Sequence, residues 1–200
     1  MQNPNAIISM LNFNLKRASR LFFIAVISLC MKVVPLKAHE ISPSILDLTI
    51  NPNSIQLKIR FSIEAMLAEI DLSEVSDTNL SENADKYDEL RTLTPNQIKK
   101  IFNKKWPYLS KHIQLIQSGR VVELSYQDLT VPDVGNTELT RISHLHLEAK
   151  IEKEEPVIFS WNANFGPIVV RQLGFDNALT QFLVNGDDSD PIFFQGSIGK

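Results

Sequence analysis

Alternation of apolar and polar side chains is the feature of this sequence that most restricts its fold. Between residues 55 and 63 an apolar side chain occupies every second position and a polar one fills each position between. Successive side chains of a β-strand point to opposite faces, so this pattern predicts a strand with one buried face. The turn-forming residues Asn51–Ser54 separate it from a second alternating segment, Ile45–Ile50. The two segments together predict a β-hairpin.

Short segments of the same kind recur through the second half of the chain. They are Ile113–Ile116, Val121–Tyr126, Leu139–Ile151, Val157–Trp161, Gly166–Leu173, Gln181–Val184 and Ile192–Phe194. The turn at Gln117–Arg120 predicts that the first two form a hairpin. About eight or nine short strands with frequent turns predict a mainly β fold, an antiparallel, immunoglobulin-like β-sandwich.

A small helical insertion is expected within the sandwich, at about residues 80–111. Thr94 is placed as an N-cap, with Pro95 as the first helical residue and Gln97 as the third, which is the spacing of a capping box. The apolar side chains that follow have helical spacing: Ile98, Ile101, Phe102 and Trp106. Pro107 is expected to end or kink this helix, because proline lacks the backbone N–H that a helix interior needs.

Residues 1–38 have the order of a secretory signal. Basic side chains precede a short apolar run, Leu21–Met31, and Ala38 provides the small residue at the cleavage point. The run is shorter than the ~20 apolar residues of a membrane-spanning helix. We therefore expect a signal-peptide helix that is cleaved after Ala38. Two alternatives stay open: an uncleaved signal-anchor extending through Val34, and a lipoprotein modified at Cys30.

Removal of the signal changes the composition of the remaining domain. Residues 1–38 hold five basic side chains and no acidic one, so the net charge of −3 becomes −8 for residues 39–200. The single cysteine also leaves, which excludes disulfides and cysteine-based zinc sites. The acidic balance gives no case for a nucleic-acid partner. We expect an exported domain over residues 39–196 with a tail at 197–200, either periplasmic or membrane-anchored and facing the periplasm.

Three histidines are candidate ligands of a copper or nickel ion. If cleavage follows Ala38, His39 becomes the N-terminus, and its α-amine and imidazole nitrogens both suit Cu(II). His144 and His146 are two positions apart on a predicted strand, so they share one face at about 6–7 Å, a spacing that a metal could bridge. The alternative interpretation of this pair is the solvated polar face of an amphipathic strand.

Other motifs give little chemistry. His112 follows the predicted helix and is expected to interact with its C-terminal dipole. The acidic stretch from Asp71 to Asp85 and the turn Asp187–Asp190 lack the spacing of a calcium-binding loop, so solvated loops are the favoured interpretation. The sequence contains no P-loop, GxGxxG, Gly-x-Ser-x-Gly or His-Glu-x-x-His motif. These observations favour a non-enzymatic protein, with a secreted hydrolase as a further class supported only by generic carboxylates.

Several short segments resemble one known family. They are Ala38–Pro43, Ile63–Ser73, Asp77–Asn79, Tyr87–Arg91, Val131–Gly135 and Phe165–Gln172. Together they resemble the exported N-terminal region that precedes the membrane helices of HupE/UreJ-like proteins, the hydrogenase/urease accessory family. The resemblance implies a part in nickel uptake or metalloenzyme maturation, with a membrane-embedded helical domain as the partner.

The expected position of the membrane helices lies after a Ser-Asp-Pro segment, here Ser189–Pro191. Only nine residues follow it in this sequence, so we expect a truncated or split family member, or a stand-alone exported domain. The alternative function is a periplasmic copper- or nickel-binding protein that uses the N-terminal histidine.

Overall fold

The computed structural model describes residues 42–137, 139–174 and 180–194. The chain divides into two units, Met1–Lys37 and Ala38–Lys200, and the description below concerns the second. The predicted signal peptide, His39 and the expected tail at 197–200 lie outside the described residues. Within the described ranges, no helix has the length and apolar character needed to cross a membrane.

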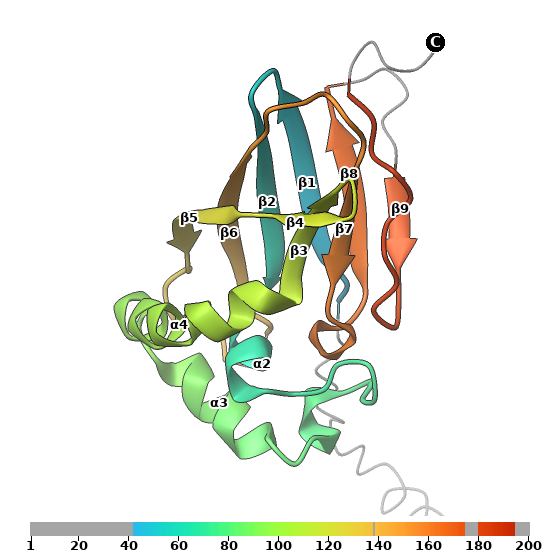
Figure 1. Ribbon diagram of the computed structural model, residues 1–200. Helices are drawn as coiled ribbons and strands as arrows, with labels where there is room; N and C mark the ends of the chain where they lie inside the picture. The colour runs from blue at the N-terminus through green and yellow to red at the C-terminus, as the bar shows by residue number, and fades with distance from the viewer. Residues whose placement is uncertain (1–41, 138, 175–179, 195–200) are drawn as a thin grey trace, which may run out of the picture. The chain divides into compact units, whose positions relative to one another are not determined.

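Two β-sheets make up most of the described structure (Figure 1). The larger has the strand order β5-β6-β2-β1-β8-β9 and the smaller has the order β4-β3-β7. The strands of the larger sheet are β1 Ser44–Asn51, β2 Ser54–Ser62, β5 Leu124–Thr130, β6 Ile142–Lys150, β8 Ile168–Leu173 and β9 Thr180–Leu183. Those of the smaller sheet are β3 Ile113–Gln117, β4 Arg120–Val122 and β7 Val157–Trp161. The prediction of a mainly β fold is confirmed.

The β1–β2 hairpin forms where the alternation predicted it. Asn51 pairs with Ser54 at the turn, and Leu48 pairs with Leu57 in the middle of the hairpin. The alternating apolar residues of β2 are buried together with Leu46 and Leu48 of β1, whereas Lys58 and its polar neighbours lie on the opposite face. Burial of one face of the strand fixes the register, since a shift of one residue would expose every apolar side chain.

One core joins the inner faces of both sheets. Leu57 and Leu147 of the larger sheet belong to the same buried cluster as Leu115 and Phe159 of the smaller sheet. Ile98 of the helical segment also belongs to it. The two sheets and the helices therefore exclude water together.

The expectation of a purely antiparallel arrangement is wrong for one strand pair. Among the described pairs, β1 and β8 alone run parallel, with Ser44 beside Ile168 and Thr49 beside Leu173. Parallel neighbours require a crossover connection, and here the chain between them contains the helices and the whole smaller sheet. Alternation reports which face of a strand is buried but carries no information on strand direction.

Two other predicted strands differ from the observed ones. Val121–Tyr126 was expected as one strand, but the chain leaves the smaller sheet after Val122 and enters the larger sheet at Leu124. Ile192–Phe194 was also expected as a strand and forms only one isolated bridge, between Ile192 and Val157. Whether a segment pairs along its whole length depends on which strand edge is free beside it. This is a property of the tertiary structure, so the local sequence pattern does not predict it.

The helices gather at one end of the two sheets (Figure 1). They are α2 Ile63–Ala68, α3 Ala84–Thr92 and α4 Pro95–Leu109, with short 3-10 turns η1 Thr78–Leu80, η2 Ser110–His112 and η3 Ala163–Phe165. The helical segment thus begins at Ile63, directly after β2, and earlier than the expected residue 80. All six residues of α2 are buried, so it has no amphipathic pattern by which the sequence could have revealed it.

The start of α4 matches the prediction. Gln97 Oε1 accepts a hydrogen bond from the Thr94 backbone N–H at 2.9 Å, and the reciprocal Thr94 side-chain contact completes a capping box. Of the two outcomes expected at Pro107, the end of the helix is not observed, because α4 continues to Leu109 with Pro107 inside it, and the kink stays a prediction. Ile98 and Phe102 are fully buried, so the apolar face anchors the helix despite the proline.

Candidate functional site

His144 and His146 lie on β6 and share one face of the larger sheet. Both are half-buried and alternate with the buried residues Leu145 and Leu147. The predicted common face is therefore observed, and the pair's neighbours can be read from the strand register.

The neighbours of these histidines carry mixed charge. On β2, Arg60 lies opposite His144 and Lys58 lies opposite His146. On β5, Asp128 lies opposite His146. Two adjacent cations oppose the binding of a metal ion, and one carboxylate favours it. Within the described ranges, no group of three or more His, Cys, Asp or Glu side chains is arranged to hold a metal ion.

His39, the third predicted ligand, lies outside the described residues. The copper or nickel site at His39, His144 and His146 therefore stays a prediction. A shallow pocket of about 200 Å³ borders His146, with Lys58 and Glu148 also in its lining.

His112 has a well-defined place at the end of the helical segment. Asn162 Nδ2 donates a hydrogen bond to His112 Nδ1 at 3.0 Å. The imidazole also packs edge-on against the rings of Tyr108 and Phe165. These contacts join the end of α4 to the turn after β7.

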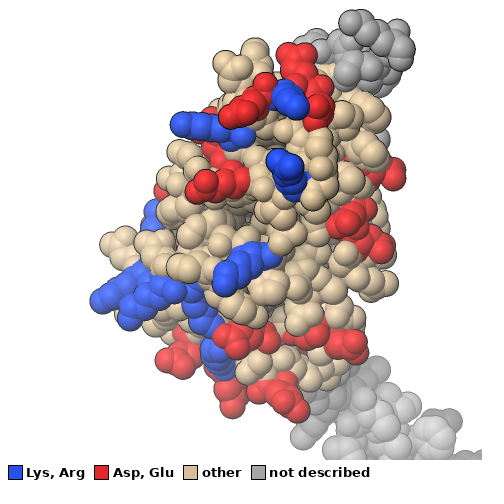
Figure 2. Space-filling view, in the orientation of Figure 1, with Lys and Arg blue, Asp and Glu red and all other residues tan. Residues whose placement is uncertain are grey.

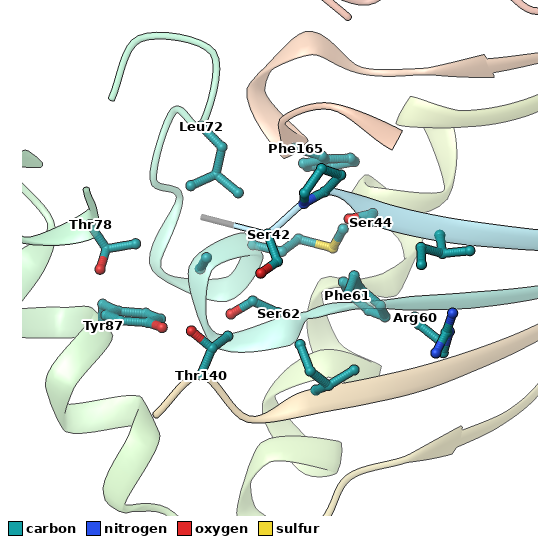
Figure 3. A pocket seen from close by; sticks show the side chains of 15 residues that line it. Ser42, Ser44, Arg60, Phe61, Ser62, Leu72, Thr78, Tyr87, Thr140 and Phe165 are labelled. Atoms are coloured by element: carbon teal, nitrogen blue, oxygen red, sulfur yellow. The ribbon is translucent and has the colours of Figure 1, made fainter. Parts of the chain in front are cut away.

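A pocket of about 210 Å³ lies where the helices meet the end of the larger sheet (Figure 3). Its walls come from the start of β1, the end of β2, α2, α3 and the residues before β6. Arg60 lies at one end of the group and Thr78 with Tyr87 at the other, and Ser42 and Ser62 lie between them. Pockets at such junctions are common ligand sites.

Three polar atoms of the pocket-lining residues are buried without a hydrogen-bond partner among the described residues. They are Arg60 Nε, Ser62 Oγ and Thr78 Oγ1. Thr78 is only 4% exposed. Burial of an unpaired polar group costs about 1–3 kcal/mol, so three of them around one pocket provide unused hydrogen-bonding capacity for a ligand.

The remaining wall of the pocket is apolar. Phe61, Met66, Leu72 and Phe165 contribute to it. The Leu72 backbone N–H donates to Asn164 O at 3.0 Å, which holds the loop after α2 against η3. The pocket thus combines apolar surface with a few polar groups, a composition suited to a small amphiphilic ligand.

A buried ion pair between Glu64 and Arg141 fixes the segment that forms one side of the pocket. Arg141 Nε donates to Glu64 Oε1 at 2.6 Å, and Arg141 Nη1 donates to Leu93 O at 3.0 Å. Arg91 Nη2 donates to Leu139 O at 2.9 Å. These bonds tie residues 139–141 to the helices and thereby position Thr140 at the pocket.

Burial raises the pKa of the Glu64 carboxyl above its usual value, and the attraction of Arg141 only partly opposes that effect. The second carboxylate oxygen, Glu64 Oε2, has no hydrogen-bond partner among the described residues. Burial of this ion pair therefore carries a desolvation cost, and only one of the two Glu64 carboxylate oxygens has a hydrogen bond with a described residue that offsets it.

Neither the pocket nor the ion pair was predicted from the sequence. Glu64 and Arg141 are separated by 77 positions, and the pocket residues come from distant segments. The one local signal is at the strand–helix junction, where Ser62 and Glu64 are the only polar residues between Phe61 and Ala68.

No protein-family model matches this chain, and no curated protein matches it. The resemblance to HupE/UreJ-like proteins is therefore carried by the short sequence segments alone.

Proposed function

We propose that this protein is a non-enzymatic binding module whose ligand occupies the pocket between the helices and the larger sheet. The supporting observation is the set of three unpaired buried polar atoms, Arg60 Nε, Ser62 Oγ and Thr78 Oγ1, on residues of one pocket. Hydrogen bonds from a ligand would remove their desolvation cost. The guanidinium of Arg60 favours a carboxylate, and Phe61, Met66 and Phe165 favour an apolar body.

The proposed setting of this module follows from the sequence. We propose an exported domain, periplasmic or membrane-anchored, that serves as the extracytoplasmic part of a HupE/UreJ-like protein and assists nickel uptake or metalloenzyme maturation. Its two sheets would pack as an immunoglobulin-like sandwich behind a signal-peptide helix. Mass spectrometry of the protein from its own cells tests the setting, since cleavage after Ala38 leaves His39 as the first residue. An N-terminus at Met1 in the cytosolic fraction would overturn it.

Phenylacetate is a suitable probe of the pocket because it joins one apolar ring to one carboxylate. In a heteronuclear NMR titration, we expect chemical-shift changes concentrated at Ser62, Met66 and Thr78. Phenylacetamide, which has the same shape without the charge, is expected to bind more weakly. Scattered shifts, or none at millimolar probe, would count against a ligand site of this chemistry.

Paired substitutions separate binding from folding. Ser62→Ala and Thr78→Val remove one hydroxyl each with little change in shape, and each is expected to weaken phenylacetate binding several-fold, as for the loss of one hydrogen bond. Ser125→Ala removes an exposed hydroxyl of β5 and serves as the matched control. Equal affinities for the wild type and all three variants would contradict the assignment.

The alternative is a copper- or nickel-binding protein, favoured by the common face of His144 and His146 on β6. Titration of the processed, tag-free protein with Cu(II) or Ni(II) is expected to give about one bound equivalent by this proposal, lost in His39→Ala. His112→Ala is the control, because that imidazole is held by Asn162 at the end of the helical segment. Binding equal to a histidine-free variant would exclude the metal function.

A further inference from the structure

The helix α4 and the turn η2 form a basic segment in an acidic domain. Residues 95–112 contain five lysines and no acidic residue, although residues 39–200 have a net charge of −8. Figure 2 shows blue side chains gathered over α4 and red side chains near α3, while red and blue side chains are mixed at the opposite end. The positive charge of this segment is therefore not offset by any acidic residue within it.

The outward face of this segment has a regular arrangement. Ile98, Phe102 and Leu109 are buried against the core. The exposed stripe, which we name the lysine stripe, consists of Lys100, Lys104, Tyr108 and Lys111, at i, i+4, i+8 and i+11. These spacings place Lys100, Lys104 and Tyr108 along one side of α4, and Lys111 follows in η2.

The lysines of the stripe differ from the adjacent lysines of α4 in having no ion-pair partner among the described residues. Lys99 approaches Asp128 at 3.9 Å, and Lys105 forms an ion pair with Glu69. Lys100, Lys104 and Lys111 form no ion pair with any described residue. The stripe therefore presents uncompensated positive charge.

Tyr108 interrupts the stripe with an aromatic ring that is 62% exposed. A tyrosine ring combines an apolar body with a polar tip, and this combination favours the interface between lipid headgroups and water. The Tyr108 ring packs edge-on against the imidazole of His112, with 4.8 Å between the ring centroids.

A second pocket, of about 630 Å³, opens beside the stripe. Its lining includes Lys104, Lys105, Tyr108 and His112 from the helical segment, and Asn162 and Asn164 from the turn after β7. The one acidic residue in its lining is Glu69, which the ion pair with Lys105 neutralises. The pocket thus has the volume and the donors for a phosphate-bearing headgroup.

We infer that the lysine stripe docks this protein on an anionic membrane surface, with the three lysines against phosphate groups and Tyr108 at headgroup depth. Charge complementarity points to an anionic occupant, because the exposed lysines of the stripe have no ion-pair partner among the described residues, whereas Lys99 and Lys105 do. The apolar face of α4 packs against the core, so the proposed contact with the bilayer rests on the exposed lysines and on Tyr108. The inference rests on the proposed export only for where the protein meets a membrane. Vesicle binding is measured independently of that export.

Vesicle flotation of the protein with its native N-terminus tests the inference. We expect binding to vesicles of phosphatidylcholine with about 30% phosphatidylglycerol, weak binding to phosphatidylcholine alone, and loss of the difference at high salt. Each lysine near such a surface contributes about fivefold in partition coefficient. The triple variant K100Q/K104Q/K111Q should therefore bind about 100-fold more weakly.

The matched control is K58Q/K150Q/K153Q, which makes the same change in net charge away from α4 and should retain binding. Tyr108→Ser should weaken binding without altering its salt dependence. Equal binding by the two triple variants would overturn the inference, as would salt-independent binding to neutral vesicles. Tighter binding to polyglutamate than to anionic vesicles would assign the stripe to an acidic protein instead.

The same variants distinguish this inference from the proposed ligand site. Phenylacetate affinity should be unchanged in K100Q/K104Q/K111Q, because none of these lysines lines the pocket of Arg60 and Thr78. Loss of vesicle binding with intact phenylacetate binding, and the reverse in Thr78→Val, would show that the two sites are separate.

Discussion

Arg141 donates through Nε to Glu64 Oε1 at 2.6 Å, across 77 positions of sequence, and the two side chains are 8% and 1% exposed. Removal of one partner leaves the other charge buried. We expect Arg141→Met to destabilise the protein by about 3–5 kcal/mol in urea unfolding. The double variant E64L/R141M should recover much of this loss, because an apolar pair costs no desolvation. A double variant as unstable as the sum of the two single variants would show that the pair is not coupled.

The raised pKa of Glu64 predicts a specific dependence of stability on pH. The pKa of this carboxyl in the unfolded chain is near 4.5. At pH values just above it, the unfolded chain has released the proton, whereas the folded carboxyl still holds it. The folded state therefore binds more protons there, and this contribution to stability is present at low pH and declines as pH rises through the raised pKa. Glu64→Gln should remove that decline, so the stability difference between variant and wild type should move in favour of the variant as pH rises.

The control for that measurement is Glu69, whose pKa is shifted in the opposite direction. Lys105 donates to Glu69 and lowers the pKa of this largely exposed carboxyl. The contribution of Glu69 to stability is therefore present above its unfolded value and lost as pH falls through the lowered pKa. Glu69→Gln should flatten the acid side of the stability profile, whereas Glu64→Gln acts on the side above pH 4.5. The same pH dependence in both variants would contradict the two assigned shifts.

The limits of sequence-based prediction can be seen at particular residues. The β1–β2 hairpin and the Thr94–Gln97 capping box follow from local rules, since a period of two and a fixed spacing are written in adjacent positions. The helix α2 could not be recognised, because burial on all sides removes the pattern that identifies a helix. The face shared by His144 and His146 was predictable, but the cations opposite them depend on the pairing with β2.

The pocket was not predictable for a related reason. Ser62, Thr78 and Thr140 line one pocket only because β2, η1 and the segment before β6 converge at the helical end of the sheet. The partners of Arg141 are likewise chosen by tertiary packing. Hydroxyl and guanidinium groups of this kind are ordinary in surface loops, so no local pattern distinguishes those that become buried.

Gly166 is expected to be intolerant of a side chain. Its φ is +77°, and a Cβ there would lie 2.9 Å from Leu72 Cβ. Gly166→Ala combines backbone strain with a clash against the pocket wall, and we expect a loss of about 2–4 kcal/mol in thermal unfolding. Gly119→Ala is the matched control, since Gly119 has φ +74° and a Cβ added there would meet nothing within 4 Å. It should lose only about 1 kcal/mol, and equal losses would show that the contact with Leu72 is unimportant.

Pro107 provides a test of the cost of proline inside α4. The residue is exposed and lies within the helix, where it cannot donate the hydrogen bond of its turn. Pro107→Ala restores that donor and relieves the ring, so we expect stabilisation of about 1 kcal/mol, reduced from the full helical cost by the greater freedom of the unfolded chain. Pro52→Ala, in the β1–β2 turn, is the control of opposite sign, because there proline restricts only the unfolded state. Chemical denaturation of both variants decides the point: destabilisation by Pro107→Ala would mean that the ring itself packs favourably in the last turn of α4.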